Sequence, residues 1–355
     1  MKSGHTIILT CFVILISAFV YNIFVIDPHL NWKIKLTHYL GELFAKYIGL
    51  RGNFSRDRLN KLKDSGLLFA KHKTTNSNYI NGVLIEDAKI TSIWSKELDK
   101  NITINAQVFH PELFKNEKLP VMLHIHGGGF VIDTPWDRSN EFCKLGMIVV
   151  SLDYRLAPEY KFPTALEDAY SALSFIFDKK HPLLEKADLS KVVVIGDSAG
   201  GNLAATLANA ALYRRPNKNL KISHQILIYP TMVHRNMTES KTKFQNGYIL
   251  SKSTLDWFHE QYIENEEDYN NPLANPLMSK SFENLPPTLI ILATDDILHS
   301  EGLIYGEALK KANVEVEIKE YISVHGFFSF FGLDAEEIEA FNYISDYLRR
   351  NRLIN

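Results

Sequence analysis

The segment Gly196–Gly200, with the sequence GDSAG, is the clearest indication of chemistry in the sequence. It follows the apolar run KVVVI and opens the helix-like stretch GNLAATLANAAL, which places Ser198 on a sharp strand-to-helix turn. Such a turn holds a serine in a strained conformation, and the flanking glycines allow the strand and the helix to pack closely. A helix beginning at Ser198 would also direct backbone N–H groups and its positive dipole end towards developing negative charge. The pattern therefore predicts that Ser198 is a nucleophile.

A second glycine-rich segment, HGGGF at residues 126–130, follows the apolar strand-like run VMLHI. Three consecutive glycines allow the backbone to turn so that N–H groups point into a cavity. Such preorganised donors are what an oxyanion hole requires. The Lys-Ser/Thr pair of a phosphate-binding P-loop does not follow. The segment is therefore interpreted as the source of oxyanion-binding N–H groups.

A serine nucleophile needs a base, and the base needs an acid to orient it. When the serine lies on such a turn, the expected chain order is serine, acid, histidine. His325 is the only histidine after the last strand-like run, VEVEIKEY, and is the predicted base. The acid is expected in the loop after TLIILAT, where Asp295 and Asp296 are both candidates.

Strand-like and helix-like runs alternate from about residue 80 to the end of the chain. Short apolar strands that alternate with helices indicate a mostly parallel sheet covered on both faces. Strands are expected at 102–110, 121–126, 147–153, 191–196, 225–230, 288–294 and 314–321, and helices at 137–145, 164–178, 201–213, 300–311 and 335–350. The interval 231–286 is too long for a simple crossover. It is expected to form an insertion on the rim that shapes a pocket.

Residues 6–26 carry no charge. About 20 apolar residues in a helix span the hydrocarbon core of a bilayer, and this run is longer than the apolar region of a signal peptide. It also has no clear cleavage site. The expected organisation is a tail at 1–5, a single transmembrane signal-anchor at 6–26, a helical cap region at 27–79 and a catalytic domain at 80–355.

The composition limits the class of protein. Of 355 residues, 46% are hydrophobic and 23% are charged, which is typical of a globular protein and excludes a disordered tail or a polytopic membrane protein. The net charge of −2 gives no indication of a nucleic-acid partner. Cys11 and Cys143 are too few for a disulfide framework or a zinc site. No metal or other cofactor is expected.

Three segments in this order, HGGGF (126–130), DYRLAPE (153–159) and GDSAGGN (196–202), resemble the hormone-sensitive lipase group of α/β-hydrolases. With the N-terminal apolar run, the chain resembles the arylacetamide deacetylase family. The resemblance covers roughly residues 80–350 and includes PLANPL (272–277), LPPTLI (285–290) and HGF (325–327). It implies an α/β-hydrolase fold with a helical cap.

The resemblance also implies roles for individual residues. The second and third glycines of HGGGF, Gly128 and Gly129, would bind the oxyanion together with Ala199, the residue after the nucleophile. The family shows an aspartate, then any residue, then a leucine, followed a few residues later by a glycine. Asp296, Leu298 and Gly302 fit this pattern. Asp296 completes a triad with Ser198 and His325. The DYRLAPE segment would support the HGGGF segment, called the oxyanion loop below, through hydrogen bonds from beneath it.

The function implied by the resemblance is a membrane-anchored serine hydrolase that cleaves carboxylic esters through an acyl-enzyme. Arylacetamides and acylglycerol-type lipids are further candidate substrates. The alternative is a non-catalytic protein that binds a small molecule on the same fold, since the plant gibberellin receptors resemble this family yet lack its complete triad. The sequence does not indicate an oligomeric state.

The resemblance further implies a single-pass type II protein of the endoplasmic reticulum with a luminal catalytic domain. The flanking lysines argue for the cytosolic side, because Lys33 and Lys35 follow the apolar run and only Lys2 precedes it. Sequons begin at Asn53, Asn101 and Asn236, a number that chance alone would give. The side of the membrane therefore rests on the resemblance.

Overall fold

The computed structural model describes residues 79–80, 82–93, 102–114, 117–132, 138–213, 220–247, 249–330 and 335–355. The predicted anchor at 6–26 and almost all of the predicted cap region at 27–79 lie outside these ranges. Within the described part of the chain, no helix combines the length and the apolar character needed to cross a bilayer. The anchor therefore stays a prediction.

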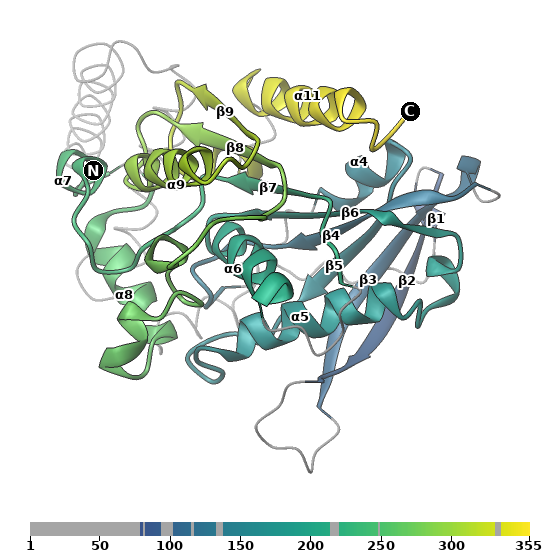
Figure 1. The fold of residues 1–355 in the computed structure, drawn as a ribbon, viewed down its shortest axis with the longest axis horizontal. Coiled ribbons are helices and arrows are strands. Elements are labelled where there is room, and N and C mark those ends of the chain that lie inside the picture. The colour runs from purple at the N-terminus through teal and green to yellow at the C-terminus, as the bar shows by residue number, and fades with distance from the viewer. Residues whose placement is uncertain are drawn as a thin grey trace, which may run out of the picture.

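A nine-stranded sheet runs through the described residues in the order β1-β2-β3-β5-β4-β6-β7-β8-β9 (Figure 1). The pairings β4–β5, β4–β6, β6–β7, β7–β8 and β8–β9 are parallel, and those that join β1, β2, β3 and β5 are antiparallel. The predicted mostly parallel sheet is therefore confirmed. The strands are β1 (Tyr79–Ile80), β2 (Val83–Thr91), β3 (Thr103–Pro111), β4 (Leu119–Ile125), β5 (Ile148–Asp153), β6 (Ala187–Asp197), β7 (His224–Ile228), β8 (Thr288–Ala293) and β9 (Val316–Tyr321).

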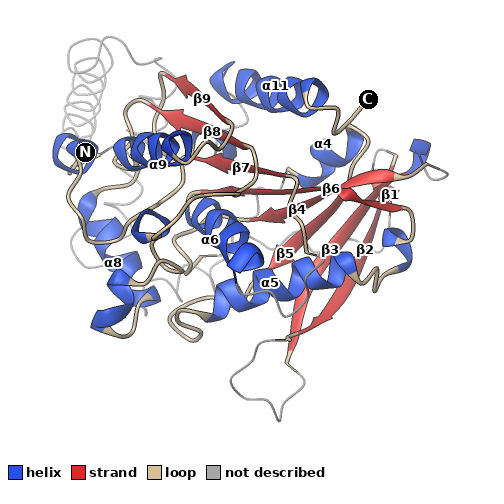
Figure 2. Ribbon diagram, in the orientation of Figure 1, coloured by secondary structure: helices blue, strands red, loops and turns tan. Residues whose placement is uncertain are grey.

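Helices cover both faces of the sheet, as Figure 2 shows. On one face lie α5, α6 and α9, and on the other α4, α10 and α11. The α-helices are α4 (Ser139–Lys144), α5 (Thr164–Phe177), α6 (Ala199–Tyr213), α7 (Glu239–Lys243), α8 (Lys252–Tyr262), α9 (His299–Lys311), α10 (Phe327–Phe330) and α11 (Ala335–Arg350). Each of the five predicted helices is present, with bounds shifted by a few residues.

The central strands are apolar throughout because both of their faces are buried. In β4, Val121, Leu123 and Ile125 pack on the side of α5 and α6, whereas Met122 packs on the side of α4 and α11.

Cys143 of α4 is fully buried on that second side, and burial raises the pKa of its thiol. This rigid sheet carries the predicted site residues at the ends of its strands.

The rim insertion, residues 231–286, lies between β7 and β8 and contains α7 and α8. Hydroxyl side chains fix the start of each helix, since Thr238 Oγ1 accepts from the Lys241 N–H and Ser251 Oγ accepts from the Thr254 N–H, both at 3.3 Å. Such N-caps stabilise a helix by about 1 kcal/mol.

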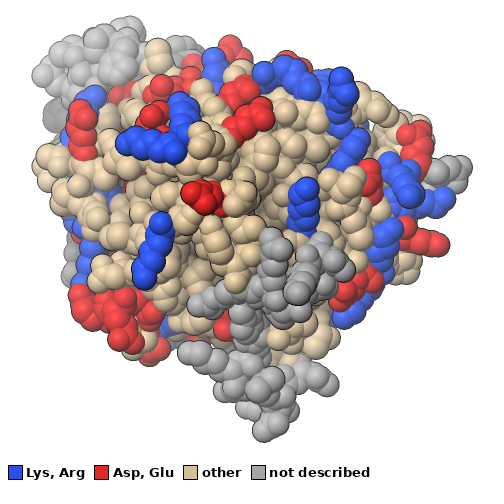
Figure 3. All heavy atoms as spheres, viewed as in Figure 1, with Lys and Arg blue, Asp and Glu red and all other residues tan. Residues whose placement is uncertain are grey.

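Charged side chains of both signs are interspersed on the face shown in Figure 3. Acidic side chains gather at the lower left of this view. In the segment after α8, Glu264, Glu266 and Glu267 are exposed. The described residues of this face therefore form no continuous basic surface.

Candidate functional site

Ser198 lies between the end of β6 at Asp197 and the start of α6 at Ala199. Its φ of 53° is in the left-handed region, which costs a non-glycine residue about 1 kcal/mol or more. The flanking glycines are required sterically. A Cβ on Gly196 would lie 2.2 Å from the Gly200 carbonyl oxygen, and a Cβ on Gly200 would lie 2.0 Å from that of Ile125. The GDSAG sequence thus permits the turn that presents Ser198.

A continuous series of polar contacts starts at the Ser198 hydroxyl. Its Oγ lies 2.9 Å from Nε2 of His325, and Nδ1 of the same ring lies 2.7 Å from Oδ2 of Asp296. The other carboxylate oxygen of Asp296 accepts the Leu298 N–H at 2.9 Å. Asp296 is 1% exposed and His325 is 7% exposed, so their contact is largely screened from water. The structure thus brings together Ser198, His325 and Asp296 from three separate loops.

The neighbouring Asp295 has a different environment. Its Oδ2 accepts a hydrogen bond from the Thr294 hydroxyl at 3.0 Å, and its N–H donates to the Ser323 carbonyl oxygen. Of the two candidate acids, it is Asp296 whose carboxylate contacts His325.

The HGGGF loop adopts the conformation that its glycines allow. Gly128 and Gly129 have φ values of 103° and 61°, and the Gly128 carbonyl oxygen accepts the N–H groups of Val131 and Ile132. No acceptor among the described residues takes the N–H of Gly128 or Gly129. Ala199, as the first residue of α6, has an N–H without an intrahelical acceptor.

Asp197 anchors the oxyanion loop to the serine turn. Its Oδ1 accepts the Gly127 N–H at 2.9 Å, and a Cβ on Gly127 would lie 2.4 Å from its Oδ2. Burial raises the pKa of Asp197, while the neighbouring histidines and the Gly127 N–H act against that rise. Sequence reasoning assigned no role to Asp197, although its position beside the nucleophile was a usable signal.

Tyr154 of the DYRLAPE segment braces the same loop. Its hydroxyl donates to the His126 carbonyl oxygen at 3.0 Å, and its ring stacks on the His126 ring with centroids 4.2 Å apart. The next residue, Arg155, binds Asp168 of α5 through its side chain at 2.6 Å and its backbone N–H at 2.9 Å. The oxyanion loop is thereby tied to the helical layer.

Helix α8 of the rim insertion covers the oxyanion loop. A Cβ on Gly129 would lie 2.4 Å from the ring of Phe258, so this ring rests directly on the glycine backbone. One turn later, the ring of Tyr262 stacks on Phe130 with centroids 3.8 Å apart. Sequence reasoning missed both aromatic residues, although their spacing of four places them on one helix face.

Among the described residues, no group of three or more His, Cys, Asp or Glu side chains could hold a metal ion. The chemistry that the described geometry offers is nucleophilic attack by a serine hydroxyl with a histidine as proton acceptor.

The chain is similar to several known proteins. A family model described as alpha/beta hydrolase fold matches residues 122–329. The carboxylic ester hydrolase LipN of Mycobacterium tuberculosis is 36% identical over 239 residues, which are 65% of this chain and 63% of LipN. The gibberellin receptor GID1B of Arabidopsis thaliana is 31% identical over 220 residues, 58% of this chain and 59% of the receptor. The matched regions thus span less than two thirds of the length of these two relatives.

A similar solved structure extends the match. The hyperthermophilic esterase of the archaeon Pyrobaculum calidifontis superposes with a TM-score of 0.71 at 30% sequence identity. The superposition covers 88% of this chain and 98% of that esterase.

Proposed function

Because the chain belongs to the alpha/beta hydrolase fold family, whose model matches residues 122–329, we propose that it is a serine hydrolase of carboxylic esters. One observation carries this proposal: Ser198 Oγ is 2.9 Å from His325 Nε2, and His325 Nδ1 is 2.7 Å from Asp296. Relatives named as ester hydrolases support the substrate class.

In the proposed mechanism, His325 takes the proton of Ser198 while Oγ attacks the acyl carbonyl carbon. Asp296 holds the imidazole in the required tautomer and stabilises the imidazolium. The negative charge on the carbonyl oxygen is bound by the N–H groups of Gly128, Gly129 and Ala199. The tetrahedral intermediate collapses, and His325 protonates the departing alcohol.

The acyl-enzyme is then hydrolysed by the same groups. His325 takes a proton from water, the resulting hydroxide attacks the acyl carbon, and the second tetrahedral intermediate releases the acid and Ser198. Each proton lost at one step is returned at the next, so no co-reactant besides water is needed.

The membership of a hormone-sensitive-lipase-type group, and within it of an arylacetamide-deacetylase-like group, is part of the proposal and is supported by the HGGGF, DYRLAPE and GDSAGGN segments. It extends the candidate substrates to arylacetamides and acylglycerol-type lipids. The alternative, a binding protein related to the gibberellin receptors, is disfavoured by the contact between Ser198 and His325, which ligand binding alone does not require.

The proposal includes a membrane anchor at residues 6–26, supported by the length of the uncharged apolar run. It also includes a luminal position of the domain in the endoplasmic reticulum, which rests on the resemblance to the arylacetamide deacetylase family. Alkaline carbonate extraction should leave the full-length protein in the membrane fraction. Release of the protein into the supernatant would contradict the anchor.

The substrate class is tested with a panel of esters and matched amides that differ in acyl-chain length. The wild-type protein should hydrolyse the esters, and Ser198→Ala should reduce their turnover to background. Ester turnover in Ser198→Ala at the wild-type rate would refute the serine mechanism.

A further inference from the structure

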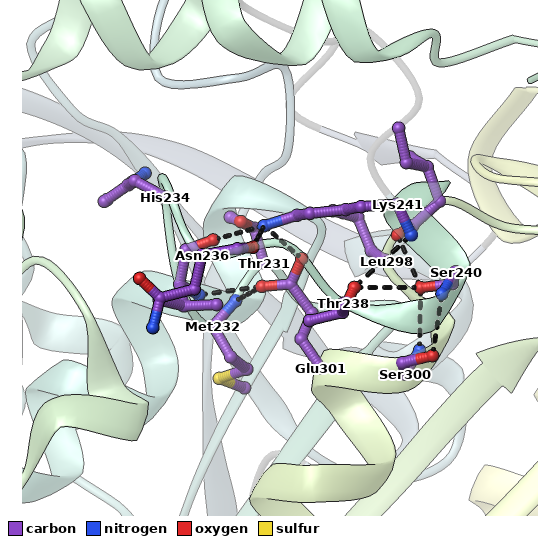
Figure 4. Close-up of polar contacts among 12 residues, drawn as sticks. Thr231, Met232, His234, Asn236, Thr238, Ser240, Lys241, Leu298, Ser300 and Glu301 are labelled. Carbon is purple, nitrogen blue, oxygen red and sulfur yellow. Dashed lines mark hydrogen bonds and ion pairs between the residues drawn. The ribbon is translucent and has the colours of Figure 1, made fainter. Parts of the chain in front are cut away.

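A buried ion pair that the proposed reaction does not use lies beside the site. Lys241 of α7 and Glu301 of α9 are 2% and 0% exposed, and their charged atoms are 3.2 Å apart (Figure 4). Burial raises the pKa of Glu301, while Lys241 and two backbone N–H donors act against that rise. Removing two charges from water is unfavourable unless both are paired and hydrogen-bonded, and both conditions are met here.

Glu301 and Lys241 hold the segment that follows the end of β7. One carboxylate oxygen of Glu301 accepts the N–H groups of Met232 and Val233 at 2.6 and 2.7 Å. The Lys241 ammonium donates to the carbonyl oxygens of Val233 at 2.7 Å and Asn236 at 3.3 Å. Figure 4 shows these bonds converging on one turn of the rim insertion. The ion pair therefore fixes the backbone at 232–236.

This segment is directly connected to the nucleophile. Thr231, which precedes Met232, donates its N–H to the Ser198 carbonyl oxygen at 3.3 Å. Its own carbonyl oxygen accepts from the Asn202 side chain of α6 at 2.9 Å. A shift at Met232 would therefore be transmitted to the turn that carries Ser198.

The same helix, α7, also holds the loop that carries Asp296. Ser240, the neighbour of Lys241, donates its hydroxyl to the Ile297 carbonyl oxygen at 2.7 Å. Ser240 and Ser300 further exchange bonds, each hydroxyl accepting the backbone N–H of the other residue at 3.0 and 3.1 Å. Ile297 follows Asp296, and Ser300 precedes Glu301. The bonds from Ser240 therefore hold the loop 296–300, which carries Asp296, at both of its ends.

We propose that Lys241 and Glu301 are positioning residues that hold the Ser198 turn and the Asp296 loop in a fixed position relative to each other. The pair acts through the rim insertion, so the docking of α7 determines whether hydroxyl, imidazole and carboxylate stay aligned. This inference rests on the proposed serine hydrolase function. A misplacement of about 1 Å in such a site can lower turnover roughly 100-fold.

The test compares Lys241→Met, Glu301→Gln and the double variant with the wild type. Each protein is titrated with a fluorophosphonate, and kcat and KM for a short-chain p-nitrophenyl ester are measured per labelled site. Lys241→Met should lower kcat about 10- to 100-fold with KM changed less than about threefold. The variant misaligns Ser198, His325 and Asp296 but does not weaken binding of the substrate in the ground state. The double variant should keep a lowered kcat, since it leaves no unpaired buried charge but still lacks the bonds from Lys241 to the Val233 and Asn236 carbonyl oxygens.

Lys252→Met is the matched control, because Lys252 forms a half-exposed ion pair with Asp256 in the same insertion. It should leave kcat and KM unchanged. If Lys241→Met does not fold, Ser240→Ala carries the test, since it removes the hydroxyl's bonds to the Ile297 carbonyl oxygen and the Ser300 N–H and no charge. Its kcat should fall, and its thermal midpoint should fall by only a few degrees, so that the variant stays folded in the assay.

Lys241→Met or Ser240→Ala with wild-type kcat and only a lower thermal midpoint would overturn the positioning role. Absence of fluorophosphonate labelling in the wild type itself would instead refute the proposed function and this inference with it. The two failures are thus distinguishable in one set of measurements.

Discussion

At the residue scale, two adjacent aspartates, Asp295 and Asp296, differ in whether they contact His325. We expect Asp296→Asn to lower kcat by about 10⁴-fold, because an amide cannot hold the His325 tautomer that accepts the Ser198 proton. Asp295→Asn is the matched control and should retain most activity, since Asp295 contacts the Thr294 hydroxyl. Steady-state kinetics on both variants would test this ranking, and the reverse order would move the acid by one residue.

Some of the site residues could be predicted from the sequence and others could not. Ser198, Gly128 and Gly129 lie in short motifs whose glycines are required locally, so the motif alone predicts them. Lys241 and Glu301 could not be predicted, because 60 residues separate them and a charged side chain is ordinarily expected on the surface. Their burial arises only once α7 and α9 have packed together.

At the scale of elements, α8 limits the space above the oxyanion loop through the ring of Phe258. We expect Phe258→Ala to shift the ratio of kcat/KM values towards bulkier esters by about tenfold, which is the lower end of the effect of one methylene group in an apolar pocket. A chain-length series of esters measures this shift. Phe282→Ala is the control, because Phe282 lies in the same insertion but packs on Tyr305. Equal shifts in both variants would contradict a specific role for Phe258.

The central elements could be predicted from their sequences, whereas β1 and β2 at the edge of the sheet were missed. Strands such as β4 are buried on both faces and read as continuous apolar runs. In β2, Val83 and Ile85 pack on one face of the sheet, whereas Ala88 and Ile90 pack on the other. The buried side changes along the strand, so the sequence shows no regular alternation.

At the scale of the whole molecule, two buried histidines in the rim insertion make folding sensitive to acid. His234 and His259 have ring centroids 4.2 Å apart, and burial lowers the pKa of His234 to about 3 and that of His259 well below its usual value. Both rings favour the neutral form in the folded state. Below the unfolded pKa of about 6.5, the unfolded chain therefore binds more protons than the folded one.

The free energy of unfolding should consequently fall as the pH is lowered from about 6.5 towards about 3, by roughly 1.4 kcal/mol per pH unit for each proton taken up. Urea unfolding at a series of pH values measures this slope. His234→Gln retains a donor for the Ala274 carbonyl oxygen, which His234 Nε2 contacts at 3.0 Å, and it should flatten the slope. An unchanged slope in that variant would exclude His234 as its source.

The central claim is that the Ser198 hydroxyl, activated by His325 and Asp296, forms the acyl-enzyme. Its most direct test is to react the folded protein with a fluorophosphonate and to identify the modified residue by peptide mass spectrometry. We expect one phosphonylated residue, Ser198, with labelling lost in Ser198→Ala and strongly slowed in Asp296→Asn. Labelling of a different residue, or undiminished labelling of Ser198→Ala, would contradict it.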